Sequence, residues 1–219
     1  MECKCCKGLC IKKGCQNRRQ KYYCKACRLY QQKTYTYRIC TPEDDRNIIK
    51  LNNIGVGINR IAHFTGISKA NVVRKIDHLA KKVRKPVIAE SGQEYEVDEM
   101  HTFIKSKNHP CYIVYAINKR TKQVIDFTIG PRTKENISKV ISTLLNLNPK
   151  KIFTDKLNVY PGLIEKNLHS TTLYKTNNIE RFNLTLRTHL KRLSRKTICF
   201  SKSVNMLENC LTLYLLNAV

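Results

Sequence analysis

Three acidic side chains occupy positions from which carboxylates could act together on metal ions. Asp98 lies within the run YEVDEMHTFI, Asp155 ends the run KKIFTD, and Glu180 lies at the start of the run IERFNLTLRTHLKRLSR. Divalent cations such as Mg²⁺ and Mn²⁺ take oxygen ligands. Three carboxylates can hold two of these ions about 3.5–4 Å apart, an arrangement that promotes in-line attack at a phosphodiester. Each acid alone is more simply an exposed surface carboxylate, but three acids at these positions, in a chain with only 16 Asp+Glu, favour a metal site.

Cysteines at the start of the chain have the spacing of a metal site. Seven of the 11 cysteines fall within the first 27 residues, and two C-x-x-C pairs stand out, Cys3 with Cys6 and Cys24 with Cys27. Four thiolates in two such pairs suit one structural Zn²⁺ ion, so a zinc ribbon is predicted over 1–38. An odd total argues against a disulfide framework, and the missing βαβ pattern argues against a redox role. Alternative ligands remain open within the same segment, at Cys5, Cys10 and Cys15.

The segment 93–219 is predicted to form the α/β domain that positions the acids. Its apolar and amphipathic runs indicate three strands, a helix and a fourth strand, at 95–104, 111–118, 123–130, 134–146 and 150–155. This is the RNase H-like order, in which the first and fourth strands are neighbours. A mixed sheet flanked by helices would therefore bring Asp98 and Asp155 together. Alternation along the first strand places Asp98 and Glu99 on opposite faces.

A long amphipathic helix over 179–195 is expected to carry the third acid. Its apolar stripe would pack on the sheet and comprises Ile179, Phe182, Leu186, Leu190 and Leu193. Glu180 lies at the edge of this stripe, and Arg187 and Lys191 follow along the same edge. An outward polar face would offer contacts to phosphates through Arg181, Thr188, Arg192 and Arg195. A last helix, roughly 203–217, is expected to close the core.

Helical periodicity over 43–85 indicates a small helical domain between the zinc ribbon and the α/β domain. Gly66 supplies a turn and Ser68 stands where an N-cap belongs, so the run 57–84 has the pattern of a helix–turn–helix. Its second helix would present to DNA Lys69, Asn71, Arg74 and Lys75. In the zinc ribbon, the expected phosphate contacts are Arg18, Arg19 and Lys21. The joint before the α/β domain is expected at Pro86–Gly92, where the proline ends a helix.

The balance of charge indicates a polyanionic partner. The chain holds 41 Lys+Arg against 16 Asp+Glu, a formal net charge of +25 that is spread over both halves. Such a field favours nucleic acid or an anionic membrane surface. No run approaches the roughly 18 uninterrupted apolar residues of a spanning helix, and the first residues lack the apolar core of a secretion signal. We therefore expect double-stranded DNA as the partner, no membrane association and a cytoplasmic location.

Several runs resemble transposases of the insertion-sequence-one family. The most specific is IERFNLTLRTHLKRLSRKTICFSKS, and the others are VDEMHTF, RTKENISKVISTLL and FTDKLNVYPGL. The resemblance covers nearly the whole chain and implies a DDE transposase with an RNase H-like core, which recognises terminal inverted repeats and uses Mg²⁺ for cleavage and strand transfer. The family's acids carry over onto Asp98, Asp155 and Glu180. Members usually have Trp where His101 stands and often His where Phe182 stands. In some members the head and the core are separate reading frames, which are fused in this chain.

Transposition brings further expectations, and two alternatives stay open. Joining two element ends requires at least two active sites, so we expect a homodimer or larger assembly on DNA, in a prokaryotic cell and associated with the nucleoid. A zinc and helix–turn–helix repressor would bind the same DNA without cleaving it. A tyrosine recombinase would use His189 and Arg192 of an H-x-x-R pattern, with Tyr214 as the nucleophile and no metal ion. The chain is short for that fold, and the three acids would have no role in it.

Overall fold

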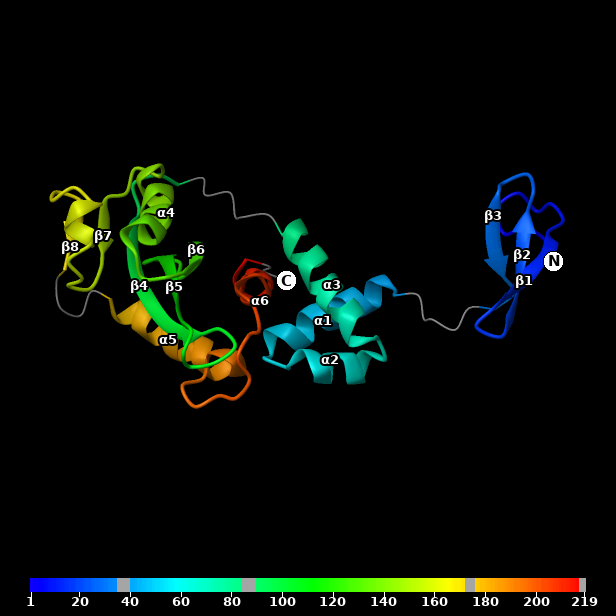
Figure 1. The fold of residues 1–219 in the computed structure, drawn as a ribbon. Coiled ribbons are helices and arrows are strands. Elements are labelled where there is room, and N and C mark those ends of the chain that lie inside the picture. Colours follow the sequence, from blue (N-terminus) through cyan, green and yellow to red (C-terminus); the bar gives the residue numbers. More distant parts are fainter. Residues whose placement is uncertain (35–39, 84–89, 172–175, 217–219) are drawn as a thin grey trace. The chain divides into compact units, whose positions relative to one another are not determined.

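The chain forms two compact units, Met1–Cys40 and Thr41–Val219. The second unit contains both the helical segment and the mixed sheet (Figure 1), which the sequence assigns to separate domains. The joint expected at Pro86 lies outside the described residues. In the described part of the chain, no helix combines the length and the apolar character that crossing a membrane requires. This computed structural model describes residues 1–34, 40–83, 90–171 and 176–216.

The first unit is built on a three-stranded antiparallel sheet. Its strands follow one another in order, β1 (Ile11–Gln16), β2 (Arg19–Cys24) and β3 (Leu29–Gln32). Asn17 and Arg18, with φ of 52° and 59°, form the two-residue loop between β1 and β2. Positive φ at both residues is what a type I′ turn requires, and the twist of this turn matches that of the strands it joins. The turn therefore leaves Arg18 exposed at the tip of the hairpin.

Three short helices open the second unit, α1 (Pro42–Asn53), α2 (Ile58–Thr65) and α3 (Lys69–Lys82). The predicted turn and cap are present, because Gly66 ends α2 with a φ of 65° and the Ser68 hydroxyl accepts the Asn71 N–H. Glycine adopts this left-handed conformation without steric cost. One side of each helix is buried where the three pack together, at Ile48, Ile61, Val72, Ile76 and Ala80.

A five-stranded mixed sheet forms the body of the second unit. Its strands are β4 (Glu94–Phe103), β5 (Pro110–Asn118), β6 (Val124–Gly130), β7 (Lys151–Phe153) and β8 (His169–Ser170). They lie in the order β6-β5-β4-β7-β8, antiparallel from β6 to β4 and parallel from β4 to β8. The first and fourth strands are therefore adjacent, as predicted. β7 is shorter than the predicted 150–155, and its pairing with β4 covers Glu94–Glu96, so Asp98 lies beyond the stretch of β4 that pairs with β7.

Helices cover both faces of this sheet (Figure 1). One face packs on α4 (Lys134–Leu145), and the other packs on α5 (Asn177–His189) and α6 (Val204–Leu215). Side chains alternate along β4, so Tyr95 and Val97 face α4, whereas Met100 joins the core beneath α5. Short 3₁₀ turns follow β7 and α5, η1 (Tyr160–Gly162) and η2 (Lys191–Leu193).

The helix predicted over 179–195 is shorter in the structure. α5 ends at His189, because Leu190 has an extended backbone with φ −104° and ψ 97°. The Ser194 hydroxyl donates to the Arg187 carbonyl at 2.9 Å and so caps the end of α5. The predicted apolar stripe is nevertheless kept in one core cluster, with Ile179, Leu186, Leu190 and Leu193 buried and Phe182 partly buried. The predicted alignment along one helix is wrong for three residues, Lys191, Arg192 and Arg195.

α6 packs against α1, α3 and β6, so it connects the helical segment to the sheet. The Asn52 side chain of α1 donates to the Cys210 carbonyl of α6 at 3.0 Å. Gly55, between α1 and α2, lies against the end of α5, where an added Cβ would stand 1.9 Å from the His189 carbonyl oxygen. The helical segment is therefore in contact with both of the last helices.

Candidate functional site

Asp98 lies on β4 where the strand faces α5, and fixed donors hold both of its oxygens. Its Oδ1 accepts the N–H of Glu99 at 2.8 Å, and its Oδ2 accepts Nδ2 of Asn183 at 2.6 Å. The Tyr115 hydroxyl donates to Oδ1 of Asn183 at 2.9 Å and so holds that amide in place. Burial raises the pKa of Asp98, although both hydrogen bonds to its carboxylate oppose the rise. The carboxylate is therefore oriented by the protein itself.

Asp155 follows the C-terminal end of β7, which lies between β4 and β8 in the sheet. Its Oδ1 accepts the Leu157 N–H at 3.0 Å, a local turn that directs the carboxylate after the strand ends. The Thr154 hydroxyl donates to the Asp155 carbonyl at 2.8 Å and lies 2.7 Å from Nε2 of His169 on β8. The Asp155 side chain keeps 46% of its surface exposed, so it forms the open side of the acidic group.

Carboxylate oxygens of Asp98, Glu99 and Asp155 lie within 4.8 Å of one another, close enough to share a metal ion. Asp98 and Glu99 come from opposite faces of β4, as the alternation predicts, and they meet Asp155 beyond the stretch paired with β7. Burial raises the pKa of Glu99 as it does that of Asp98, and repulsion from Asp155 adds to both shifts. A divalent cation bound by oxygen ligands relieves such repulsion.

Glu180 lies in the first turn of α5, outside this group of oxygens. It is exposed, and its Oε1 accepts the Thr176 hydroxyl at 3.1 Å. Its negative charge is near enough to contribute to the raised pKa of Asp98. The structure therefore brings two of the three predicted acids together, with Glu99 as the third member and Glu180 nearby.

A buried carboxylate from β4 anchors the start of α5. Glu96 is fully buried, and its two oxygens accept the Ile179 N–H at 2.9 Å and Nδ2 of Asn178 at 2.5 Å. The residue before the helix, Thr176, makes no capping hydrogen bond of its own. A negative charge at a helix N-terminus satisfies free N–H groups and complements the helix dipole. Glu96 therefore fixes the turn from which Glu180 projects.

The basic residues predicted along the 179–195 helix differ in what they contact. Arg187 is half-buried and donates to the Leu193 carbonyl at 2.9 Å and to the His101 carbonyl at 3.1 Å. Burial lowers its pKa, and its two hydrogen bonds brace the end of α5 against β4. Arg192 donates to the Ser201 hydroxyl at 3.0 Å. Three of the predicted cations are exposed, Arg181, Lys191 and Arg195.

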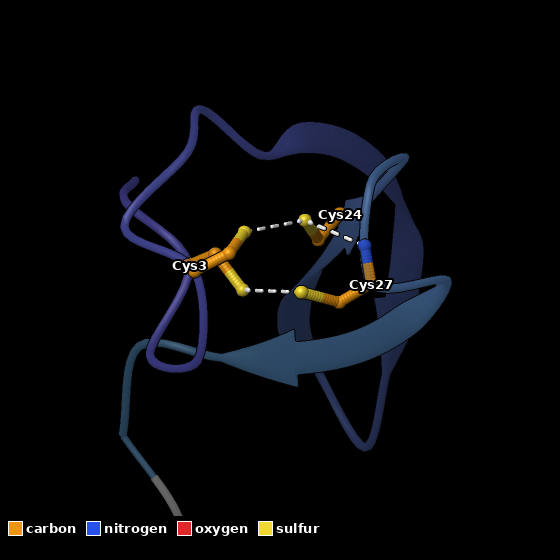
Figure 2. Close-up of side chains that lie close together, drawn as sticks. Cys3, Cys24 and Cys27 are labelled. Carbon is orange, nitrogen blue, oxygen red and sulfur yellow. Dashed lines mark hydrogen bonds between the residues drawn. The ribbon is translucent and has the colours of Figure 1, made fainter.

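In the first unit, four thiols lie within 4.8 Å of one another, those of Cys3, Cys6, Cys24 and Cys27. The Sγ atoms are 3.5 Å apart for Cys6 and Cys24 and 4.0 Å apart for Cys3 and Cys27, and Figure 2 shows the cysteines facing one another. Four sulfurs placed tetrahedrally at about 2.3 Å from a zinc ion stand about 3.8 Å apart, so this donor set fits Zn²⁺. Three nearby cysteines lie outside the group, Cys5, Cys10 and Cys15.

Hydrogen bonds to sulfur favour the thiolate form of Cys3 in this cluster. The Cys5 N–H donates to Sγ of Cys3 at 3.4 Å, and Nε2 of Gln31 on β3 donates to the same atom at 2.9 Å. Hydrogen bonds from the backbone of Cys6 and Cys5 lower the pKa of Cys3 to about 6. Because the thiolate is the form that binds metal, Cys3 is prepared for an ion, whereas hydrogen bonding with Cys6 and burial raise the pKa of Cys27.

The predicted DNA contacts of the head and of α3 are mostly accessible. Arg19 donates to the Thr34 carbonyl at 3.2 Å, and Nζ of Lys21 lies 4.3 Å from the centre of the Tyr30 ring. On α3, Lys69 is exposed and Arg74 donates to Oδ1 of Asn71 at 3.1 Å. Lys75 instead forms an ion pair with Asp45 of α1 at 2.8 Å, so it ties two helices together rather than projecting outward.

Two side chains at the site escaped the sequence analysis, Asn183 and Arg132. Asn183 could have been found, because it lies three residues after Glu180 and therefore on the same side of the helix. Arg132 follows β6 and donates to Glu99 through Nε at 3.2 Å and Nη2 at 2.9 Å. No spacing in the sequence relates it to the acids, because it comes from a different connection.

Two of the side chains that a tyrosine recombinase would use, His189 and Tyr214, are in contact. Nδ1 of His189 and the hydroxyl of Tyr214 are 2.6 Å apart. Burial raises the pKa of Tyr214, which disfavours the phenolate that would attack phosphorus. Arg192, the third member, bonds to Ser201.

Comparison with known proteins identifies the family. The profile described as IS1 transposase matches residues 94–218, more than half of the chain. Insertion element iso-IS1n protein InsB of Shigella dysenteriae is 39% identical over 113 residues, which cover 52% of this chain and 86% of that protein. Insertion element IS1 4 protein InsB of Escherichia coli strain K12 is 32% identical over 120 residues, which cover 55% and 72%.

One solved structure also aligns, the cryo-EM structure of the simian T-cell lymphotropic virus intasome in complex with PP2A regulatory subunit B56 gamma. The alignment covers 78% of this chain and 69% of that chain at 16% identity, and its TM-score of 0.39 is too low to establish a common fold. The family match and the InsB relatives define a DNA transposase. The chain belongs to the IS1 transposase family.

Proposed function

We propose that the chain cleaves DNA at the ends of an insertion sequence and joins those ends to target DNA, with an RNase H-like catalytic domain over 93–219. The observation that carries this proposal is the meeting of Asp98 and Asp155 at neighbouring parallel strands, β4 and β7. The strand order β6-β5-β4-β7-β8 supports the RNase H-like fold, since its first and fourth strands supply the two acids.

In this proposal Asp98, Asp155 and Glu180 are the DDE residues and hold two Mg²⁺ or Mn²⁺ ions, with Glu180 joining from the first turn of α5, outside the group of oxygens that Asp98 and Asp155 form. The chemistry supplied there is activation of water or of a DNA 3′-hydroxyl and stabilisation of the leaving oxygen. The chain itself orients the ligands: Asn183 fixes Asp98 by a hydrogen bond, and Glu96 fixes the helical turn that carries Glu180.

The remaining parts of the chain serve DNA recognition in this proposal. One Zn²⁺ ion bound by the four-cysteine cluster would make 1–38 a zinc ribbon, and α2 with α3 would form the helix–turn–helix of a domain over 43–85. Together they would bind terminal inverted repeats, through Arg18, Arg19, Lys21, Lys69, Asn71 and Arg74. The net charge of +25 supports this assignment. Synapsis of two ends would require a homodimer or a larger assembly.

A cleavage and joining assay on a duplex that spans the element end, with Mg²⁺ or Mn²⁺, tests the proposal. Each of D98N, D155N and E180Q is expected to lower joining by at least about 100-fold, because losing even an indirect metal partner costs 10–100-fold. DNA binding should persist in all three. The control is E135Q, an exposed acid in the first turn of α4. Full joining by any one variant removes that residue from the metal site, and binding without cleavage by the wild type favours the repressor alternative.

A further inference from the structure

Arg132 places a cation beside the proposed metal ligands. It lies in the connection between β6 and α4, and its Nη2 is 3.9 Å from Oδ2 of Asp155. Its Nε and Nη2 both donate to Oε2 of Glu99, at 3.2 Å and 2.9 Å. The side chain nevertheless keeps 40% of its surface exposed. The guanidinium is therefore anchored on one side and open to solvent on the other.

Glu99 holds this arginine with both of its oxygens already engaged. Its side chain is only 1% exposed, and Oε2 receives both bonds from Arg132. Oε1 accepts the hydroxyl of Tyr160, a fully buried residue packed in the core beneath α4. A metal ion taking Oε1 would compete with the buried Tyr160 hydroxyl, which is costly, and one taking Oε2 would compete with the Arg132 guanidinium. Glu99 is thus better suited to orienting Arg132 than to binding an ion.

A guanidinium in this position is repelled by divalent cations unless an anion lies between them. Arg and Mg²⁺ together clamp phosphoryl groups by sharing their oxygens, and guanidinium–phosphate hydrogen bonds are among the strong ones. A guanidinium carries five N–H groups. Within the described part of the chain, Nη1 of Arg132 makes no hydrogen bond, so its N–H groups are available to a phosphate oxygen.

We propose that Arg132, oriented by Glu99, binds a DNA phosphate next to the position of cleavage. The inference rests on the proposed function, because it takes Asp98 and Asp155 as the metal ligands that meet the same DNA. Arg132 is then a substrate-binding residue, and Glu99 is a positioning residue that acts through it. The acid next to Asp98 in the sequence thereby has a role different from that of its neighbour.

Binding of a labelled duplex that spans the junction of element end and flanking DNA tests this proposal. R132Q is expected to weaken binding by about 10-fold or more, the scale of one hydrogen bond to a charged group, whereas R132K should lose less. The matched control is R120Q, because Arg120 is also an exposed, ion-paired arginine, joined to Glu90 at 2.6 Å. On a duplex whose phosphates at the cleavage position are neutral methylphosphonates, R132Q and the wild type should bind equally.

Further results decide between the outcomes. A loss of binding affinity in R132Q that persists on the neutral duplex overturns the proposal. Unchanged binding affinity in R132Q also overturns it, and if the Mg²⁺ concentration required for joining is then shifted, Arg132 is a counter-ion of Asp155. E99Q should weaken binding as R132Q does, and the double variant no further, because both act through one contact. Additive losses would remove Glu99 as the positioning residue. Wild-type binding without joining refutes the proposed function, while the comparison of the two duplexes still decides the role of Arg132.

Discussion

Substituting Glu96 with glutamine should loosen the start of α5 without changing the size of the side chain. Glutamine keeps one acceptor oxygen, but its NH₂ group would face either the Ile179 N–H or Nδ2 of Asn178, both of which are donors. The loss of one hydrogen bond to a charged acceptor costs about 1.5–3 kcal/mol, and the lost charge at the helix N-terminus adds about 0.3–1 kcal/mol. We therefore expect E96Q to lower the free energy of unfolding by roughly 2–4 kcal/mol.

Urea denaturation followed by circular dichroism measures this loss, and hydrogen exchange of the Ile179 amide locates it. The control is E94Q on the same strand. The Glu94 side chain is 39% exposed, and its Oε2 lies 3.6 Å from Nζ of Lys119, a long ion pair worth less than about 1 kcal/mol. If E96Q and E94Q unfold at the same urea concentration with equal protection of α5, the anchoring of α5 by Glu96 is refuted.

Two further predictions concern the other parts of the chain. Removing metal with a chelator, or the substitution C24S, should unfold the first unit while the second stays folded, because so small a unit has little core of its own. Nuclear magnetic resonance of the amides in the β1–β2 hairpin measures this unfolding. A hairpin that stays intact after chelation would contradict a structural metal ion. G55A should cost more than about 1 kcal/mol in the free energy of unfolding, because Gly55 has a φ of 78° and no room for a Cβ. G57A is the control, since nothing lies within 4 Å of the added Cβ, and equal stability of the two variants would speak against the contact with α5.

Local patterns in the sequence were sufficient for the strands and most of the helices. The strand expected over 95–104 is found over Glu94–Phe103, because apolar and polar residues alternate there with the two-residue period of a strand. The N-cap at Ser68 and the turn at Gly66 depend on their own side chains and on the adjacent backbone, so they too could be predicted. The meeting of Asp98 and Asp155 followed from strand order alone.

Features that depend on distant partners could not be predicted in this way. The apolar spacing of the predicted 179–195 helix continues through Leu193, yet α5 ends at His189, where Arg187 bonds to the carbonyls of Leu193 and His101. Glu99 is likewise engaged by partners far along the chain, one of them Tyr160. Sequence periodicity reports the face that a residue occupies and carries no information on which donors reach it.

The contact between α1 and α6 determines when α1 can complete its packing while the chain is being synthesised. Asn52 is almost fully buried, and its amide donates to the carbonyl of Cys210, which lies 158 residues further along. At synthesis rates of about 5–20 residues per second, that partner leaves the ribosome roughly 8–30 s later. A nascent chain therefore holds α1 to α3 with part of their packing surface uncovered until translation reaches α6. α6 packs against both the helical segment and the sheet. A chain released before α6 is synthesised therefore leaves both of them incompletely packed.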